Sequence, residues 1–176
     1  MKMKLKQKNI KLGIVSAIAL GSLGLSSASF ATETAGTLSV KASVATSCTI
    51  STTELDFGTY DTAAAAAKAG TGGSVTYNCT NGTAGTVRIA GGSNVDSGDP
   101  GTEASPNRRM KNGASYLNYE LYKALPSTVW GNTAESGIIL SGTGSDVTVP
   151  IQGAIPAGQA STAGGYTDSV AITLFY

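Results

Sequence analysis

The sequence contains no histidine, and this absence removes several classes of chemistry. A Ser-His-Asp or Cys-His catalytic arrangement cannot be built without the imidazole base. A zinc site lacks ligands as well, because the chain holds only two cysteines. The eleven acidic residues are scattered, and no Gly-rich phosphate loop precedes a helical pattern. We therefore expect a protein that is not an enzyme and that needs no metal or cofactor.

Long apolar runs are also missing. The most apolar stretch, residues 12–25, is interrupted by Gly and Ser and is shorter than the roughly 20 residues of a membrane-spanning helix. Five lysines precede it, and small residues follow it. This pattern predicts a signal peptide over residues 1–31, cleaved after Ala31 or, as second choice, after Ala28. We expect an exported protein with no membrane span once the signal is removed.

Positive charge is scarce after the signal. The mature chain has seven basic and eleven acidic residues, a net charge of −4. Such a balance argues against nucleic acid or an anionic membrane surface as a partner. The remaining length fits one domain, because typical domains hold about 100–150 residues.

The two cysteines, Cys48 and Cys79, belong to a chain addressed to an oxidising compartment. One intramolecular disulfide is the prediction. A redox role is disfavoured because the sequence lacks a Cys-x-x-Cys pattern.

The rest of the chain is rich in Gly, Ser, Thr and Ala, with short β-type runs between turn signals such as Asn81-Gly82 and Asn112-Gly113. Many short strands of this kind favour an antiparallel sandwich or barrel. Residues 63–69 are too short for a stable helix and are expected to form a loop or a single turn. The strands are expected at 37–45, 48–57, 73–79, 85–90, 116–123, 137–140, 146–152 and 167–176.

The first and last of these strands alternate most clearly. Because side chains on a strand point to opposite faces in turn, each of the two segments has one apolar face. Chain ends usually fray, so two strand-like ends suggest that one end is meant for a partner. The apolar faces are formed by Leu38, Val40, Ala42 and Val44 in the first segment and by Val170, Ile172, Leu174 and Tyr176 in the last.

Other conspicuous residues have simple structural explanations. Phe57, Tyr119, Leu121 and Trp130 are expected in the core or at its rim, with a sugar-binding platform as the alternative for Trp130. Residues 92–107 are expected to form an exposed loop. Its acidic residues match no Ca²⁺-loop spacing, so solvated charge is favoured. The acidic residues of this loop are Asp96, Asp99 and Glu103. Solvated charge is also expected for the basic residues that follow, Arg108, Arg109 and Lys111.

Several short strings, taken together, resemble the spore coat protein U domain family. That family includes pilin subunits of archaic (Csu-type) chaperone–usher pili of Gram-negative bacteria. The similarity covers essentially all of residues 37–176. The strings are Cys48-Thr49-Ile50, Leu55-Asp56-Phe57-Gly58-Thr59-Tyr60, Gly73 to Cys79, Leu117 to Tyr122 with Trp130-Gly131, Val149 to Gln159, and Gly165-Tyr166-Thr167-Asp168.

The resemblance implies an immunoglobulin-like sandwich that lacks its last strand, so that a hydrophobic groove lies open. A periplasmic chaperone fills the groove first, and the N-terminal extension of a neighbouring subunit replaces the chaperone at an outer-membrane usher. In this chain it implies a donor extension over residues 32–46, with Leu38, Val40, Ala42 and Val44 as its apolar face. The pilin domain would then span residues 47–176, and its C-terminal strand, with Val170, Ile172, Leu174 and Tyr176, would border the groove.

The resemblance thus predicts a fibre subunit that polymerises into a cell-surface pilus for attachment and biofilm growth. A secreted, self-contained binding domain or adhesin, which does not polymerise, is the alternative. One domain with an extension favours the fibre subunit.

Overall fold

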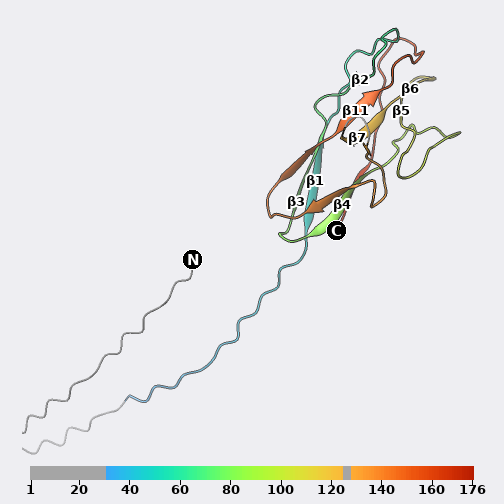
Figure 1. The fold of residues 1–176 in the computed structure, drawn as a ribbon. Coiled ribbons are helices and arrows are strands. Elements are labelled where there is room, and N and C mark those ends of the chain that lie inside the picture. The colour runs from blue at the N-terminus through green and yellow to red at the C-terminus, as the bar shows by residue number, and fades with distance from the viewer. Residues whose placement is uncertain (1–30, 125–127) are drawn as a thin grey trace, which may run out of the picture. The chain divides into compact units, whose positions relative to one another are not determined.

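The structure is a computed structural model that describes residues 31–124 and 128–176. The predicted signal, apart from Ala31, lies outside the described residues. Within them, all regular secondary structure is strand (Figure 1). The strands are β1 (Cys48–Thr53), β2 (Lys68–Ala69), β3 (Ser74–Cys79), β4 (Ala84–Ile89), β5 (Arg109–Asn112), β6 (Ser115–Asn118), β7 (Glu120–Ala124), β8 (Thr128–Val129), β9 (Ile138–Ser141), β10 (Val147–Pro150), β11 (Gln152–Ile155) and β12 (Ile172–Phe175).

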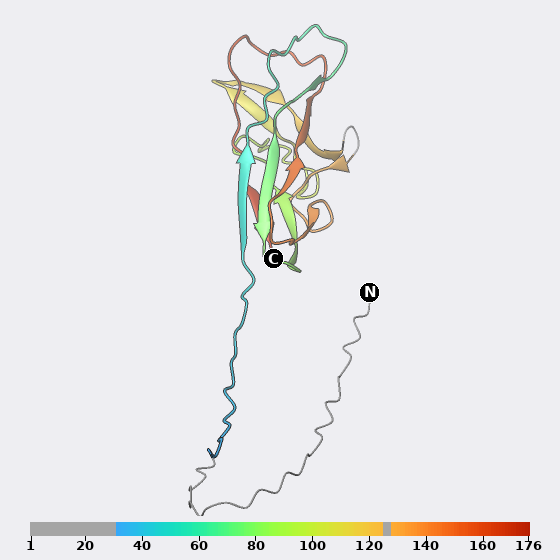
Figure 2. The same ribbon diagram turned by 90° about the vertical axis from the view of Figure 1, so that its left-hand side faces the viewer.

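The strands form four small sheets, and every pairing is antiparallel. Two three-stranded sheets have the orders β1-β3-β10 and β12-β4-β9. A four-stranded sheet has the order β2-β11-β7-β8, and β5 and β6 form a hairpin. Figure 2 shows β1, in cyan, at the outer edge of its sheet.

The core lies between the sheets and follows from the two-residue period of the strands. Val75, Tyr77 and Cys79 on β3 are buried, and Val87 and Ile89 on β4 face them in the same cluster. The predicted all-β antiparallel sandwich is confirmed. The core is completed by Phe57, Leu117, Tyr119, Leu121, Trp130, Leu140, Ile151 and Ile155.

The predicted disulfide joins Cys48 to Cys79, and the two residues lie directly opposite each other where β1 pairs with β3. Their Cα atoms are 4.1 Å apart, the close spacing of an antiparallel pair that shares no backbone hydrogen bonds. In the chain-entropy model a disulfide that closes a loop of this size contributes roughly 3–4 kcal/mol.

The strand boundaries differ from the sequence expectation at sheet changes. The expected strand 116–123 divides at Tyr119 into β6 and β7, which belong to different sheets. In the same way the chain passes from β10 to β11 at Ile151 and changes sheets. Strands β2, β5 and β8 were not expected, and β2 ends the segment 63–69 where a loop or single turn was predicted. Strand β11 runs beyond the predicted strand 146–152, and the last strand is shorter than predicted, with residues 167–171 outside it. Residues 37–45 form no strand in the single chain.

Candidate functional site

The C-terminal strand β12 has one unpaired edge. It pairs with β4 alone, and no other strand of the described residues adjoins it. Ala90 N donates to Ala171 O at 2.9 Å, so residue 171 directs its backbone groups toward β4. Along a strand, the backbone N–H and C=O groups of successive residues point to opposite edges. The N–H and C=O groups of Val170, Ile172 and Leu174 therefore point to the free edge. Their side chains are half-buried against the core. Tyr176, expected on the same face, follows the last residue of β12 and is 61% exposed.

Strand β1 also has a free edge, because it pairs with β3 alone. Ile50 lies opposite Tyr77 and shares its core-facing side of the sheet. Tyr77 is 5% exposed, whereas Ile50 is 39% exposed. An isoleucine that faces the core and remains this exposed shows that the sandwich is open beside β1.

The two free edges border one groove. Its volume is about 920 Å³, and it is lined by Thr52 and Thr53 of β1 and by Ile172 of β12. Beyond the strands, residues 54–62 form one wall and residues 161–168 the other. The floor is apolar and consists of Met110, Leu117, Tyr119, Leu121, Ile151 and Ile155.

One wall is held by hydrogen bonds around Tyr60. The Tyr60 hydroxyl donates to Pro156 O at 2.8 Å and accepts from Gln159 N at 3.0 Å. The Gln159 side-chain amide bonds both backbone groups of Asn118, accepting from N and donating to O at 2.8 Å each. Gln159 therefore takes the place of a strand partner for the end of β6, and its backbone N–H ties this partner to Tyr60 in the wall.

Gly153 lets two wall residues, Leu55 and Phe57, lie against the floor. A Cβ at this position would come within 2.6 Å of Leu55 Cδ2 and 2.9 Å of Phe57 Cζ. Only a residue without a side chain allows Leu55 and Phe57 to pack so closely on β11. Phe57 also meets Tyr119 edge to face, with 5.9 Å between ring centroids.

A buried ion pair adjoins the floor, because Glu120 lies between the floor residues Tyr119 and Leu121. Arg108 is 1% exposed and forms a salt bridge with Glu120 at the start of β7. Its guanidinium also donates to the carbonyl oxygens of Ala90, Ile89 and Trp130 at 2.9, 3.0 and 2.7 Å. Burial lowers the pKa of Arg108, and the Glu120 carboxylate opposes this shift. The expectation that Arg108 is a solvated surface charge was wrong, because its four polar contacts replace water.

The N-terminal extension has exposed apolar side chains. Residues 32–46 form no strand, and Leu38, Val40 and Val44 are 84, 83 and 85% exposed. Ala42, between them, is exposed as well. Among the residues that the structure describes, the large apolar side chains of this segment are thus left exposed.

A model of the Spore Coat Protein U domain matches residues 34–173. The chain belongs to this family. Protein U of Myxococcus xanthus is 35% identical to it over 179 residues, which cover 95% of this chain and 98% of that protein.

A solved structure with a similar fold is the crystal structure of the CsuC–CsuE chaperone–tip adhesion subunit pre-assembly complex from archaic chaperone–usher Csu pili of Acinetobacter baumannii. The TM-score is 0.52 at 20% sequence identity. The match covers 76% of this chain, and this chain spans 40% of the length of the chain it matches. At this identity the likeness shows the fold.

The strings that resemble the Spore Coat Protein U domain gather around the groove. Residues 55–60 form one wall, and residues 165–168 belong to the other. Leu117, Tyr119 and Leu121 lie on the floor. The irregular walls have no periodicity by which sequence reasoning could have placed them, so the family strings were the available signal.

The remaining sequence candidates lie in other environments. Trp130 is fully buried and donates from Nε1 to Val87 O at 2.9 Å, so it offers no sugar-binding surface. Asp96 pairs with Arg109 at 3.1 Å, and Glu103 accepts from Asn132 Nδ2 at 2.6 Å. Among residues 31–124 and 128–176, no group of acidic or cysteine side chains is arranged to hold a metal ion, and no helix is long and apolar enough to cross a membrane.

Proposed function

We propose that this protein is a structural subunit of an archaic chaperone–usher pilus that polymerises by donor-strand exchange. One observation carries the proposal: a groove with an apolar floor lies beside the free edges of β1 and β12, while the same chain has an exposed extension with an apolar face. In this proposal residues 1–31 are the signal, residues 32–46 the donor and residues 47–176 the acceptor domain. The occupant of the groove is the extension of a second copy.

The energetics favour such an occupant. Leu38, Val40 and Val44 would each contribute about 1.5–3 kcal/mol on full burial, and Ala42 less. A strand in the groove would also pair with the N–H and C=O groups that β1 and β12 leave free. Val170, Ile172 and Leu174 would border the inserted strand, with Tyr176 at its end.

The open groove also supports the proposal that a periplasmic chaperone binds this subunit. Unpaired strand edges beside an apolar surface associate with other chains until they are covered. A subunit that crosses the periplasm in this state needs a temporary strand before its neighbour supplies one. The similar fold in a chaperone–subunit pre-assembly complex fits this need. An outer-membrane usher and a surface pilus that supports attachment and biofilm growth complete the proposal.

Deleting residues 32–45 tests the function. The shortened chain keeps its groove, so it should still form a complex with its periplasmic chaperone. It should give no SDS-resistant ladder of polymers, because it has no strand to donate. The intact chain, prepared in parallel, should give the ladder. A ladder from the shortened chain, or an intact chain that is a stable monomer with a free extension and without any chaperone, would favour a self-contained binding domain instead.

A further inference from the structure

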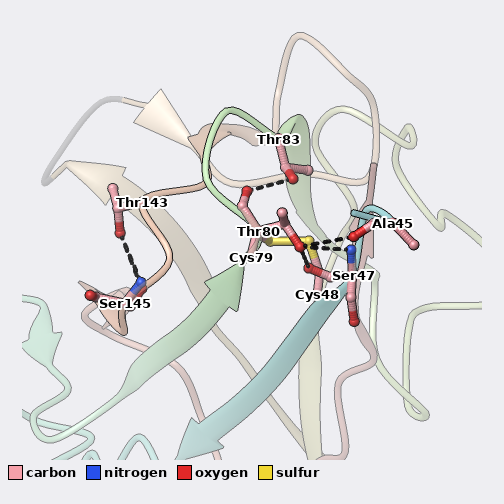
Figure 3. Close-up of a disulfide and its surroundings, with 8 residues drawn as sticks. All are labelled: Ala45, Ser47, Cys48, Cys79, Thr80, Thr83, Thr143 and Ser145. Atoms are coloured by element: carbon pink, nitrogen blue, oxygen red, sulfur yellow. Dashed lines mark hydrogen bonds between the residues drawn. A yellow bond between two sulfur atoms is a disulfide. The ribbon is translucent and has the colours of Figure 1, made fainter. Parts of the chain in front are cut away.

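The junction between the extension and β1 is held by one threonine. Thr80 follows β3, and its hydroxyl accepts a hydrogen bond from Ser47 N at 3.1 Å (Figure 3). The same oxygen lies 3.3 Å from the carbonyl oxygens of Ala45 and Ser47 and donates to one of them. Thr80 N donates to Ser47 O at 2.9 Å. With the adjacent Cys48–Cys79 disulfide, these bonds keep residues 45–47 in line with β1.

The extension could enter either of two grooves, that of a neighbouring copy or that of its own domain. Because it joins β1 directly, it can enter its own groove beside β1 only by reversing direction and running antiparallel to that strand. The reversal must occur within the residues that Thr80 holds.

Loop length decides which face would enter. A two-residue turn at Thr46-Ser47 would place Val44 opposite Thr49 and Ala42 opposite Ser51. Thr49 and Ser51 alternate with the core-facing Ile50, so the apolar face would point to solvent. A three-residue turn over 45–47 would place Ala42 opposite Ile50, with the apolar face inward. Such a turn favours a glycine at its last position, and the chain has Ala45-Thr46-Ser47 there.

We propose that Thr80 and the turn-poor sequence of residues 45–47 prevent the extension from filling its own groove. Thr80 thus keeps the groove open for a second copy of the chain and is a positioning residue for assembly. This inference rests on the proposed function, because it concerns which copy supplies the donor strand.

The test removes both obstacles. The variant Ser47→Gly/Thr80→Val supplies the glycine that a three-residue turn over 45–47 favours at its last position. It also removes the hydroxyl while it keeps the shape of residue 80. The control Ser47→Gly/Thr80→Ser has the same turn residue and retains the hydroxyl. Each full-length chain is exported to a bacterial periplasm without a chaperone. The monomer fraction is measured by gel filtration, and trypsin cleavage after the exposed Lys41 reports whether the extension is free.

The Thr80→Val variant should give a several-fold higher monomer fraction than the control, with Lys41 protected. Thr80→Ala in the same background carries the same expectation if valine lowers the yield. Equal monomer fractions for variant and control, or cleavage at Lys41 in the variant's monomer, would overturn the inference and leave donor-strand exchange intact. A wild-type monomer with Lys41 protected would also overturn it. A stable wild-type monomer that trypsin cuts at Lys41 would instead contradict the proposed function.

Discussion

The Tyr119 hydroxyl donates a hydrogen bond to Asp168 Oδ2 at 2.7 Å and so joins the floor of the groove to the segment that leads into β12. The other carboxylate oxygen of Asp168 accepts from Ser93 N at 3.0 Å and from Asn94 N at 3.2 Å. The bonds of Asp168 therefore fix the place where the last strand begins. Since β12 provides one edge of the groove, its position determines whether an added strand can pair.

This bond predicts an alkaline limit to stability. Burial, and next the hydrogen bond to Asp168, raise the pKa of Tyr119 above its ordinary value near 10. The unfolded chain releases this proton near pH 10 while the folded chain keeps it, so the stabilisation is complete below pH 10 and is lost above it. The free energy of unfolding should fall by up to about 1.4 kcal/mol per pH unit from this group.

The measurement is urea unfolding of a donor-fused chain, in which a second copy of residues 32–46 follows Tyr176 through a Gly/Ser linker. Tyr119→Phe should cost about 1.5–3 kcal/mol at pH 7, because it removes a hydrogen bond to a charged group. Above pH 10 the variant should lose stability less steeply than the parent. Equal slopes in the two chains would show that Tyr119 titrates normally.

The sequence predicted the sandwich because its central strands alternate. Ser74 to Cys79 and the Asn112-Gly113 turn could be recognised locally, and so could the paired cysteines. The changes of sheet at Tyr119 and Ile151 could not, since alternation continues through them. Arg108 was misplaced for a similar reason: its partners are Glu120 and distant backbone carbonyls, which no local pattern shows.

The buried ion pair makes a prediction about two adjacent arginines. Arg108→Gln should destabilise the donor-fused chain by about 3–5 kcal/mol, because it leaves the half-buried Glu120 without its counter-charge. The control is Arg109→Gln. Arg109 pairs with the more exposed Asp96, donates to Asn94 O and lies over the Tyr116 ring, but its loss leaves no buried charge unpaired, so it should cost less, about 1–2 kcal/mol. Similar losses of unfolding free energy in the two variants would contradict the assignment of Arg108 to the core.

The disulfide makes a third prediction. Mass spectrometry of the exported protein under non-reducing conditions should find no free thiol, since Cys48 and Cys79 are bonded. Cys48→Ser should lower the stability of the donor-fused chain by about 2–5 kcal/mol and reduce the exported yield. The double variant Cys48→Ser/Cys79→Ser removes the same single bond. The double variant should therefore lose about the same unfolding free energy as Cys48→Ser. A loss about twice as large would show that side-chain packing, and not the cross-link, determines the loss of stability.

The last prediction separates the two faces of the extension. Val40→Asp places a carboxylate on the apolar face that we propose to enter a neighbour's groove. The groove floor is apolar and offers Tyr119 and aliphatic side chains, so the charge would be buried unpaired at high cost. The variant should still form a complex with the chaperone through its own groove, which the substitution leaves unchanged. It should form no SDS-resistant ladder.

The matched control is the neighbouring residue. Lys41→Ser changes the opposite face of the strand, which points away from the groove when Val40 points into it. Removing this exposed charge should leave the ladder nearly normal. If both variants lose the SDS-resistant ladder, any change in the extension blocks export or chaperone binding. Normal ladders from Val40→Asp would mean that the apolar face is not what the groove receives, because no inserted strand could hide a carboxylate among Leu117, Leu121 and Ile155 without weakening the polymer.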